Sequence, residues 1–292
     1  RDGCLMLPAP FIPRLARFRF AVKPSRSLPG RGEVLRGRGG LSTDFADYRD
    51  YVAGDDLRAL DWNIMARLRR PVMKLYRVEQ DRHLVLLVDC SASMAEGGKR
   101  ERALAVATAL AVVGLHGGEA VSVWTFGAGC TRLLPPQRGR QGLQRTLAAC
   151  AAAPAAAGDT TVEDATRAVA GRHLGRGAAI VVSDFHRGGL RPALDRLGAI
   201  GLDPLAVQIL APSERAPELP DDLRLVDGES GEELEVAATP ASLAAYADAL
   251  QARTRALADS CRARGGRLLD VDSSEALEAL LFSRMVKEGW IV

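Results

Sequence analysis

The chain has 292 residues, of which 47% are hydrophobic and 26% are charged, a composition typical of a globular protein with a sizeable core. Its formal net charge of +3 is too small to indicate a nucleic-acid-binding protein. The five cysteines include no Cys-x-x-Cys pair, so we expect neither a disulfide framework nor a cysteine zinc site.

The hydropathy pattern predicts no membrane span. The longest apolar run, residues 103–115, is rich in alanine and shorter than the roughly 20 residues that a bilayer-spanning helix needs. No signal peptide is recognisable. We therefore expect a cytoplasmic location.

Changes in composition divide the chain into three parts. Residues 1–30 are rich in proline and arginine, which predicts an extended N-terminal tail. Residues 31–83 are rich in charge and aromatic side chains, and we expect them to pack on the main domain. Residues 84–285 form that main domain.

The segment 31–83 offers a possible partner-binding surface. A turn at 54–56 is expected to cap a helix over 57–66, and residues 72–79 read as a strand. Aromatic and charged side chains alternate here, which is typical either of a buried polar network or of a protein interface. Plentiful acidic residues argue against nucleic acid. The candidate partner-binding residues are Tyr48, Arg49, Tyr51, Asp55, Asp56, Arg58, Asp61 and Trp62.

A buried strand at 84–88 runs directly into Asp89. Its unbroken apolar character is typical of a central strand in a parallel sheet, whose functional groups gather beyond the carboxyl ends of the strands. Asp89, Ser91 and Ser93 then supply one carboxylate and two hydroxyls, which suit a hard cation such as Mg²⁺. The alternative is that this Asp merely caps the next helix.

Strands and helices alternate through the rest of the chain, which predicts a doubly wound α/β fold with a mostly parallel sheet. The predicted helices span 99–115, 142–153, 162–174, 190–200, 239–264 and 274–282. The predicted strands span 120–126, 132–134, 177–183, 205–210 and 267–271, with a β-hairpin over 223–236.

Two further loops carry possible cation ligands. Asp184 ends the second buried strand, and Thr160 lies in a glycine-containing turn. We expect three loops to meet at one edge of the sheet, and they supply only Asp, Ser and Thr side chains. This combination favours a metal site over a simple helix cap.

These residues resemble the metal site and the sequence signature of known protein families. Asp89, Ser91, Ser93, Thr160 and Asp184 are similar to the metal-ion-dependent adhesion site of von Willebrand factor type A domains. The segment 45–63 resembles the signature of the bacterial family called "domain of unknown function fifty-eight", and the resemblance covers about residues 33–285.

The resemblance implies a function. Ser91, Ser93 and Thr160 would bind Mg²⁺ (or Mn²⁺ or Ca²⁺) through hydroxyls, with Asp89 and Asp184 direct or through water. Family members are often linked to MoxR-type AAA+ ATPases and to the assembly or activation of protein complexes. Asp159 replaces a glycine of the family pattern and could ligate or tune the metal. Thr161 leaves the coordinating threonine open.

The rival function is a metal-assisted hydrolase or phosphoryl-transfer enzyme that uses Asp89. The sequence offers no evident general base for such an enzyme, and of its histidines only His186 lies near the predicted site. The sequence also lacks a glycine-rich phosphate-binding loop with a lysine. We therefore expect a non-enzymatic, metal-dependent protein interaction module.

Overall fold

The computed structural model describes residues 7–21, 45–55, 57–76, 82–155, 157–172, 175–218, 222–226, 233–237 and 239–292. The chain divides into two compact units, one formed by Ser27–Gln80 and one by Arg1–Arg26 with Asp81–Val292. The predicted boundaries at 30 and 83, and the packing of the segment 31–83 on the main domain, stay predictions.

The larger unit is built on a six-stranded sheet with the order β10-β7-β6-β3-β4-β5. Every neighbouring pair is parallel except β4 and β5, which are antiparallel at one edge. The predicted doubly wound, mostly parallel sheet is therefore confirmed. The strands are β3 (Arg82–Asp89), β4 (Ala120–Gly127), β5 (Gly129–Gln137), β6 (Arg176–Ser183), β7 (Leu202–Leu210) and β10 (Leu268–Asp272).

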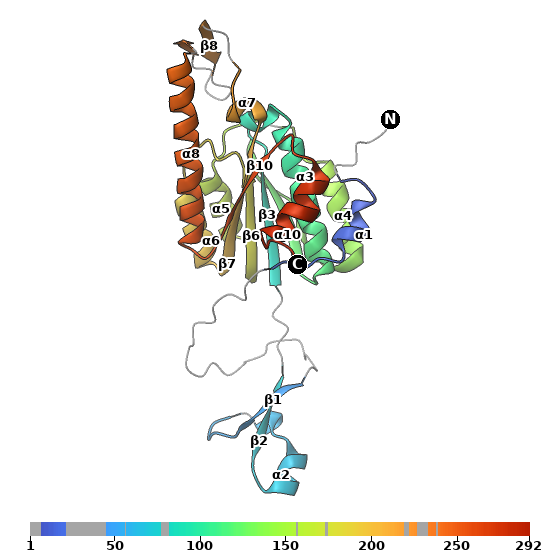
Figure 1. Ribbon diagram of the computed structural model, residues 1–292. Coiled ribbons are helices and arrows are strands. Elements are labelled where there is room, and N and C mark those ends of the chain that lie inside the picture. Colours follow the sequence, from blue (N-terminus) through green and yellow to red (C-terminus); the bar gives the residue numbers. More distant parts are fainter. Residues whose placement is uncertain are drawn as a thin grey trace. The chain divides into compact units, whose positions relative to one another are not determined.

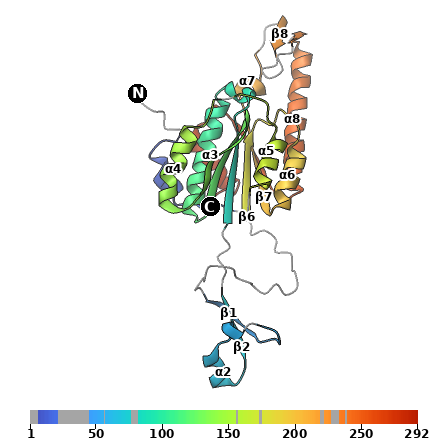
Figure 2. The ribbon, with the colours of Figure 1, turned by 180° about the vertical axis from the view of Figure 1, so that it is seen from behind.

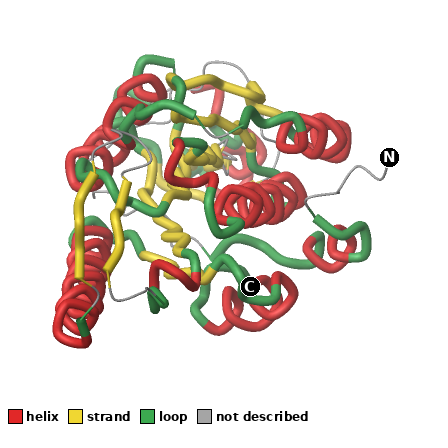
Figure 3. The backbone as a smooth tube through the Cα atoms, turned by 90° about the horizontal axis from the view of Figure 1, so that it is seen from above, coloured by secondary structure: helices red, strands yellow, loops and turns green. Residues whose placement is uncertain are grey.

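Helices cover both faces of this sheet (Figures 1 and 2). Figure 3 looks along the strands and shows helices on either side of them. One face carries α1 (Phe11–Leu15), α3 (Lys99–His116) and α4 (Gly139–Ala151). The other carries α5 (Val162–Ala170), α6 (Leu190–Ala199) and α8 (Pro240–Arg262). The short helix α7 (Pro212–Arg215) follows β7.

Strand β3 is buried on both faces because its side chains alternate between two cores. Leu84, Leu86 and Val88 pack into the core that contains α3, whereas Val85 and Leu87 pack into the core that contains α5 and α6. An apolar residue is therefore required at every position, which explains the unbroken apolar run in the sequence.

The order of the strands reverses beside β3. The chain runs from β3 to its neighbour β4 on one side, and later returns through β6 on the other side. In doubly wound sheets the crevice beyond the carboxyl ends of the strands at such a reversal is where ligands bind. Asp89 ends β3 and Asp184 follows β6, so both flank this crevice.

The N-terminal residues differ from the predicted extended tail. Phe11–Leu15 forms a helical turn, and Leu7 and Leu15 are buried in the core with α3. Phe20 forms an isolated β-bridge with Ile291 near the other end of the chain. The prolines do break long elements, but the apolar residues between them have enough hydrophobic surface to hold the segment against the core.

The smaller unit contains a two-stranded antiparallel sheet of β1 (Phe45–Asp50) and β2 (Val72–Tyr76). The helix predicted over 57–66 is instead split. A 3-10 turn covers Leu57–Ala59, and α2 (Trp62–Leu68) begins after Asp61. The reason is the cap: the Asp61 carboxylate accepts hydrogen bonds from the backbone N–H groups of Asn63 and Ile64.

The C-terminal elements include the predicted hairpin strands, β8 (Asp222–Val226) and β9 (Glu233–Ala237), which pair antiparallel. The helix predicted over 274–282 begins later, with α9 (Leu277–Ala279) followed by a π-helical turn at Leu280–Arg284 and α10 (Met285–Lys287). None of the helices in the described ranges combines the length and the hydropathy that crossing a membrane requires.

Candidate metal centre

The loop after β3 folds around the carboxylate of Asp89. Asp89 Oδ1 accepts a hydrogen bond from the backbone N–H of Ser91 at 2.8 Å, and its Oδ2 accepts one from the Ser183 hydroxyl at 2.5 Å. The helix-cap alternative is wrong, because α3 has Gly98 as its N-cap and the preceding 3-10 turn has Ser91. Asp89 is only 4% exposed, so the fold holds a nearly buried carboxylate at the end of the central strand.

The hydroxyls of Ser91 and Ser93 lie beside this carboxylate. Their Oγ atoms are 3.1 Å apart, and both residues line a small cavity of about 10 Å³, which is space for one water-sized particle. The other lining residues are Asp89, Phe126, Thr160, Thr161, Val162, Ser183, Asp184 and Arg187. All five predicted metal ligands therefore meet at one cavity.

The structure distinguishes the two threonines that the sequence left open. Thr161 is the N-cap of α5, and its Oγ1 accepts a hydrogen bond from the backbone N–H of Asp164 and donates to the Asp164 carboxylate. Thr160 Oγ1 accepts a hydrogen bond from the backbone N–H of Gly129 at 2.8 Å. The hydroxyl hydrogen bonds of Thr161 are thus committed to the helix, which favours Thr160 as the ligand.

Asp159 does not line the cavity. Its side chain is 80% exposed, and its carboxylate lies 3.6 Å from the guanidinium of Arg187. The tuning role considered for this residue would therefore act through Arg187, which does line the cavity.

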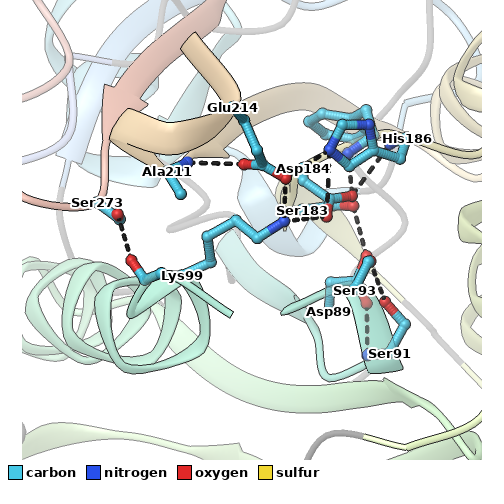
Figure 4. A network of polar contacts seen from close by, with 12 residues as sticks. Asp89, Ser91, Ser93, Lys99, Ser183, Asp184, His186, Ala211, Glu214 and Ser273 are labelled. Carbon is cyan, nitrogen blue, oxygen red and sulfur yellow. Dashed lines mark hydrogen bonds and ion pairs between the residues drawn. The ribbon is translucent and has the colours of Figure 1, made fainter. Parts of the chain in front are cut away.

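The carboxylate of Asp184 faces a buried lysine (Figure 4). Lys99 Nζ donates hydrogen bonds to Asp184 Oδ2 at 2.9 Å and to Glu214 Oε1 at 2.5 Å. Lys99 is 1% exposed, and it is the first residue of α3. The other carboxylate oxygen of Asp184 accepts the backbone N–H of His186 at 3.0 Å. Both oxygens of this predicted ligand therefore already have a donor.

His186 completes a cluster with these groups. Its Nε2 lies 2.8 Å from Glu214 Oε1, and its Nδ1 lies 3.3 Å from a guanidinium nitrogen of Arg253. Because the guanidinium can only donate, Nδ1 is the acceptor and Nε2 carries the proton. Ligand atoms of Asp184, His186 and Glu214 all lie within 4.8 Å of one another, a spacing that could hold a metal ion.

The electrostatics of the site follow from burial and from these contacts. Burial raises the pKa of Asp89 to about 6, against the opposing effect of the hydrogen bonds from Ser183 and Ser91. For Glu214, burial also acts to raise the pKa, but hydrogen bonds from His186 and Lys99 outweigh it and hold the pKa at about 2. The pKa values of Asp89 and Glu214 move in opposite directions because Glu214, unlike Asp89, has the Lys99 ammonium beside it.

The donor set fits a hard divalent cation. Two carboxylates and three hydroxyls offer only oxygen atoms, which are the ligands that Mg²⁺, Mn²⁺ and Ca²⁺ prefer. The raised pKa of Asp89 indicates a buried carboxylate without a compensating positive charge of its own, a deficit that a bound cation would remove.

Four of the predicted partner-binding residues form two hydrogen-bonded pairs within the smaller unit. Arg49 donates two hydrogen bonds to the carboxylate of Asp55, at 2.7 and 2.8 Å. The hydroxyl of Tyr48 lies 3.3 Å from Asp61 Oδ2, and Asp61 is buried at the start of α2. Arg49, Asp55 and Asp61 thus have a structural role whatever else they do.

Tyr48 and the remaining predicted partner-binding residues are mostly accessible in the structure. Trp62 is 61% exposed and Tyr48 is 42% exposed, Arg58 is also exposed, and Tyr51 is half-buried. Asp56 lies outside the described residues. That this surface binds a partner stays a prediction.

Sequence reasoning missed Lys99, Ser183 and Glu214 as members of the site. A signal for Lys99 was available, because a cation in the first turn of a helix opposes the helix dipole and calls for a compensating anion. Glu214 follows the carboxyl end of β7, the same edge of the sheet as the other ligands. Ser183 carried no signal beyond its place just before Asp184.

A family model and a mycobacterial relative both match most of this chain. The model described as "Protein of unknown function DUF58" matches residues 47–256. The uncharacterized protein Rv1480 of Mycobacterium tuberculosis (strain ATCC 25618 / H37Rv) is 34% identical over 246 residues, which cover 80% of this chain and 75% of that protein.

Solved structures give weaker likenesses. BatB from Bacteroides thetaiotaomicron is 15% identical with a TM-score of 0.42, over 70% of this chain and 99% of that one. Proximal thread matrix protein 1 from the mussel byssus, with a zinc-occupied MIDAS motif, is 14% identical with a TM-score of 0.36, over 46% of this chain and 39% of that one. At these scores neither likeness bears on what this chain binds. The family match and the mycobacterial relative show that the chain belongs to the family described as Protein of unknown function DUF58.

Proposed function

We propose that this chain is a non-enzymatic protein interaction module whose binding depends on a divalent metal ion, Mg²⁺ in the first place. The observation that carries the proposal is the meeting of five oxygen-bearing side chains at one cavity of about 10 Å³ beside the reversal of strand order. Asp89, Ser91, Ser93, Thr160 and Asp184 would hold the ion. Because three of these ligands are neutral hydroxyls, the bound ion would remain electrophilic enough to accept a carboxylate from a partner.

The partner that the family resemblance implies is a MoxR-type AAA+ ATPase, and the role would be the assembly or activation of another protein complex. Exposed side chains of the smaller unit, such as Trp62 and Tyr48, would add a second, metal-independent contact. We place this activity in the bacterial cytoplasm.

The experiment is a pull-down from native bacterial lysate with the tagged chain. Four conditions are compared: wild type with Mg²⁺, wild type with chelator, Asp89→Ala with Mg²⁺, and Asp248→Ala with Mg²⁺. Asp248 is an exposed carboxylate on α8 and serves as the matched control. We expect a MoxR-type ATPase only with wild type and Asp248→Ala in Mg²⁺. Equal recovery in all four conditions would show that the metal is not the contact.

A hydrolase or phosphoryl-transfer enzyme remains the rival. Among the described residues that line the cavity there is no histidine, and both ring nitrogens of nearby His186 are engaged by Glu214 and Arg253. A general base poised on the cavity is therefore hard to assign. Turnover of p-nitrophenyl phosphate that needs Mg²⁺ and disappears in Asp89→Ala would reverse this judgement.

A further inference from the structure

The cluster of Asp184, His186 and Glu214 combines an imidazole with two carboxylates. Such ligands suit zinc, cobalt and nickel better than Mg²⁺, because imidazole is a ligand of choice for transition metals. This cluster adjoins the hydroxyl-rich cavity and shares Asp184 with it. The chain therefore places two possible cation positions of different chemical preference side by side.

Lys99 already fills the second position. Its Nζ contacts the same two oxygens, Asp184 Oδ2 and Glu214 Oε1, that a metal in the cluster would need. His186 Nε2 converges on the same pair, at 3.8 Å from Asp184 Oδ2 and 2.8 Å from Glu214 Oε1. Figure 4 shows the lysine side chain extending from α3 toward these three groups. A metal ion and the ammonium would compete for one set of oxygens.

The ammonium is stable in this place. Lys99 is 1% exposed, and a buried ammonium without partners would be strongly disfavoured. Its Nζ instead donates hydrogen bonds to one carboxylate oxygen of Asp184 and one of Glu214, which compensate the positive charge. The two carboxylates thus hold the ammonium inside the cluster.

We propose that Lys99 determines the metal specificity of the centre: its ammonium closes the Asp184–His186–Glu214 cluster to transition metals and leaves only the hydroxyl-rich cavity open to a hard cation. This inference rests on the proposed function, because it assigns Mg²⁺ to that cavity. Lys99 is a positioning residue here, since it acts through the carboxylates that it holds.

The test compares Lys99→Met, Lys99→Arg and wild type by titration with Co²⁺ and Zn²⁺. Methionine has a similar length without the charge, so Asp184 and Glu214 lose their counter-ion and the imidazole becomes accessible to a metal. We expect one additional equivalent of Co²⁺ in Lys99→Met, with the strong visible absorption of a cobalt ion of low coordination number, and Zn²⁺ binding tighter by at least about tenfold. Lys99→Arg keeps the charge and should behave as wild type.

Two further variants assign the new site. In Lys99→Met, the additional Co²⁺ should survive the change Asp89→Ala and disappear with His186→Ala. In the chain with Lys99 intact, His186→Ala should leave Zn²⁺ affinity unchanged, because the closed cluster does not take part. This second comparison can overturn the proposal even if Lys99→Met does not fold.

The proposal is overturned if folded Lys99→Met binds Co²⁺ and Zn²⁺ as wild type does, or if His186→Ala weakens Zn²⁺ binding while Lys99 is present. Failure of the proposed function looks different: Mg²⁺ would then not bind to wild type in an Asp89-dependent way, while Lys99→Met would still gain its transition-metal site.

Discussion

The ammonium of Lys99 lies 2.9 Å from a carboxylate oxygen of Asp184, although 85 positions separate the two residues in the sequence. Both side chains are almost completely buried. The pair joins the start of α3 to the loop after β6 and so fixes one side of the candidate metal centre. Its strength can be measured independently of any metal.

Replacing Lys99 should destabilise the fold. We expect Lys99→Met to lower the free energy of unfolding by about 3–5 kcal/mol, because removing one partner leaves buried carboxylates unpaired. Urea denaturation in chelator at pH 7 measures the loss. The control is Lys287→Met, an exposed lysine, for which we expect a change within about 0.5 kcal/mol. Similar losses in both variants would show that the buried pair contributes no more than a surface charge.

The two adjacent threonines should separate metal binding from stability. Thr160→Val is expected to weaken Mg²⁺ binding by at least about tenfold with little change in stability, because its hydroxyl lines the cavity. Thr161→Val should lower the free energy of unfolding by about 1 kcal/mol, because its hydroxyl caps α5, while Mg²⁺ affinity changes far less. Calorimetric Mg²⁺ titration and urea denaturation are both made on each variant. The reverse pattern would make Thr161 the ligand.

Gly158 lets the turn that carries Thr160 lie close to the backbone of Gly127 and Ala128. Its φ is +76°, and an added Cβ would lie 2.6 Å from the Ala128 Cα and the Gly127 carbonyl oxygen. Gly158→Ala should therefore displace Thr160 and weaken Mg²⁺ binding as well as lower stability. Gly118→Ala is the matched control, because its φ of +87° is similarly strained but its Cβ would meet nothing within 4 Å. It should cost only about 1 kcal/mol of stability and leave Mg²⁺ affinity intact.

The pKa of Asp89 predicts an unusual dependence of stability on pH. Because the pKa rises from 3.8 in the unfolded chain to about 6 in the fold, the folded state binds the proton more tightly. Asp89 therefore destabilises the fold above about pH 6, and this effect is relieved as the pH falls toward 4. Without metal, Asp89→Asn should be more stable than wild type at pH 7.5 by roughly 2–3 kcal/mol, a difference that shrinks toward pH 4.5.

Thermal or urea unfolding of both proteins in chelator at several pH values between 4.5 and 7.5 checks this prediction. The lowered pKa of Glu214 has the opposite sign, because its stabilising effect is lost as the pH falls from 4.5 toward 2. Its window lies below the range measured, and it is present in both proteins. A difference between wild type and Asp89→Asn that does not vary with pH would contradict a raised pKa at Asp89.

The sequence predicts the sheet and most of the centre because these depend on local patterns. A short run of branched apolar residues such as 84–88 favours a strand that is covered on both faces, and polar side chains after such parallel strands meet at one edge of the sheet. Asp89, Ser91, Ser93 and Asp184 follow from this rule, whereas Thr160 lies in a loop between two helices and is a predicted ligand through the resemblance to type A domains. The structure brings all five to one cavity.

What the sequence does not predict depends on contacts between distant residues. Glu214 reaches Lys99 across 115 positions, and no local pattern contains that pairing. The choice between Thr160 and Thr161 depends on which hydroxyl caps α5. Sequence patterns do not place the start of a helix to within one residue. The start of α2 differs from the predicted one for the same reason, because Asp61 rather than the earlier aspartates supplies the cap.

The most direct test of the central claim is a calorimetric titration of Mg²⁺ into wild type, Asp89→Ala, Ser91→Ala and the control Asp248→Ala. We predict one equivalent of Mg²⁺ bound by wild type and by Asp248→Ala, and affinity weakened by at least about tenfold in Asp89→Ala and Ser91→Ala. Unchanged Mg²⁺ affinity in Asp89→Ala and Ser91→Ala would contradict the assignment of the cavity as the metal centre, and with it the proposed metal-dependent binding.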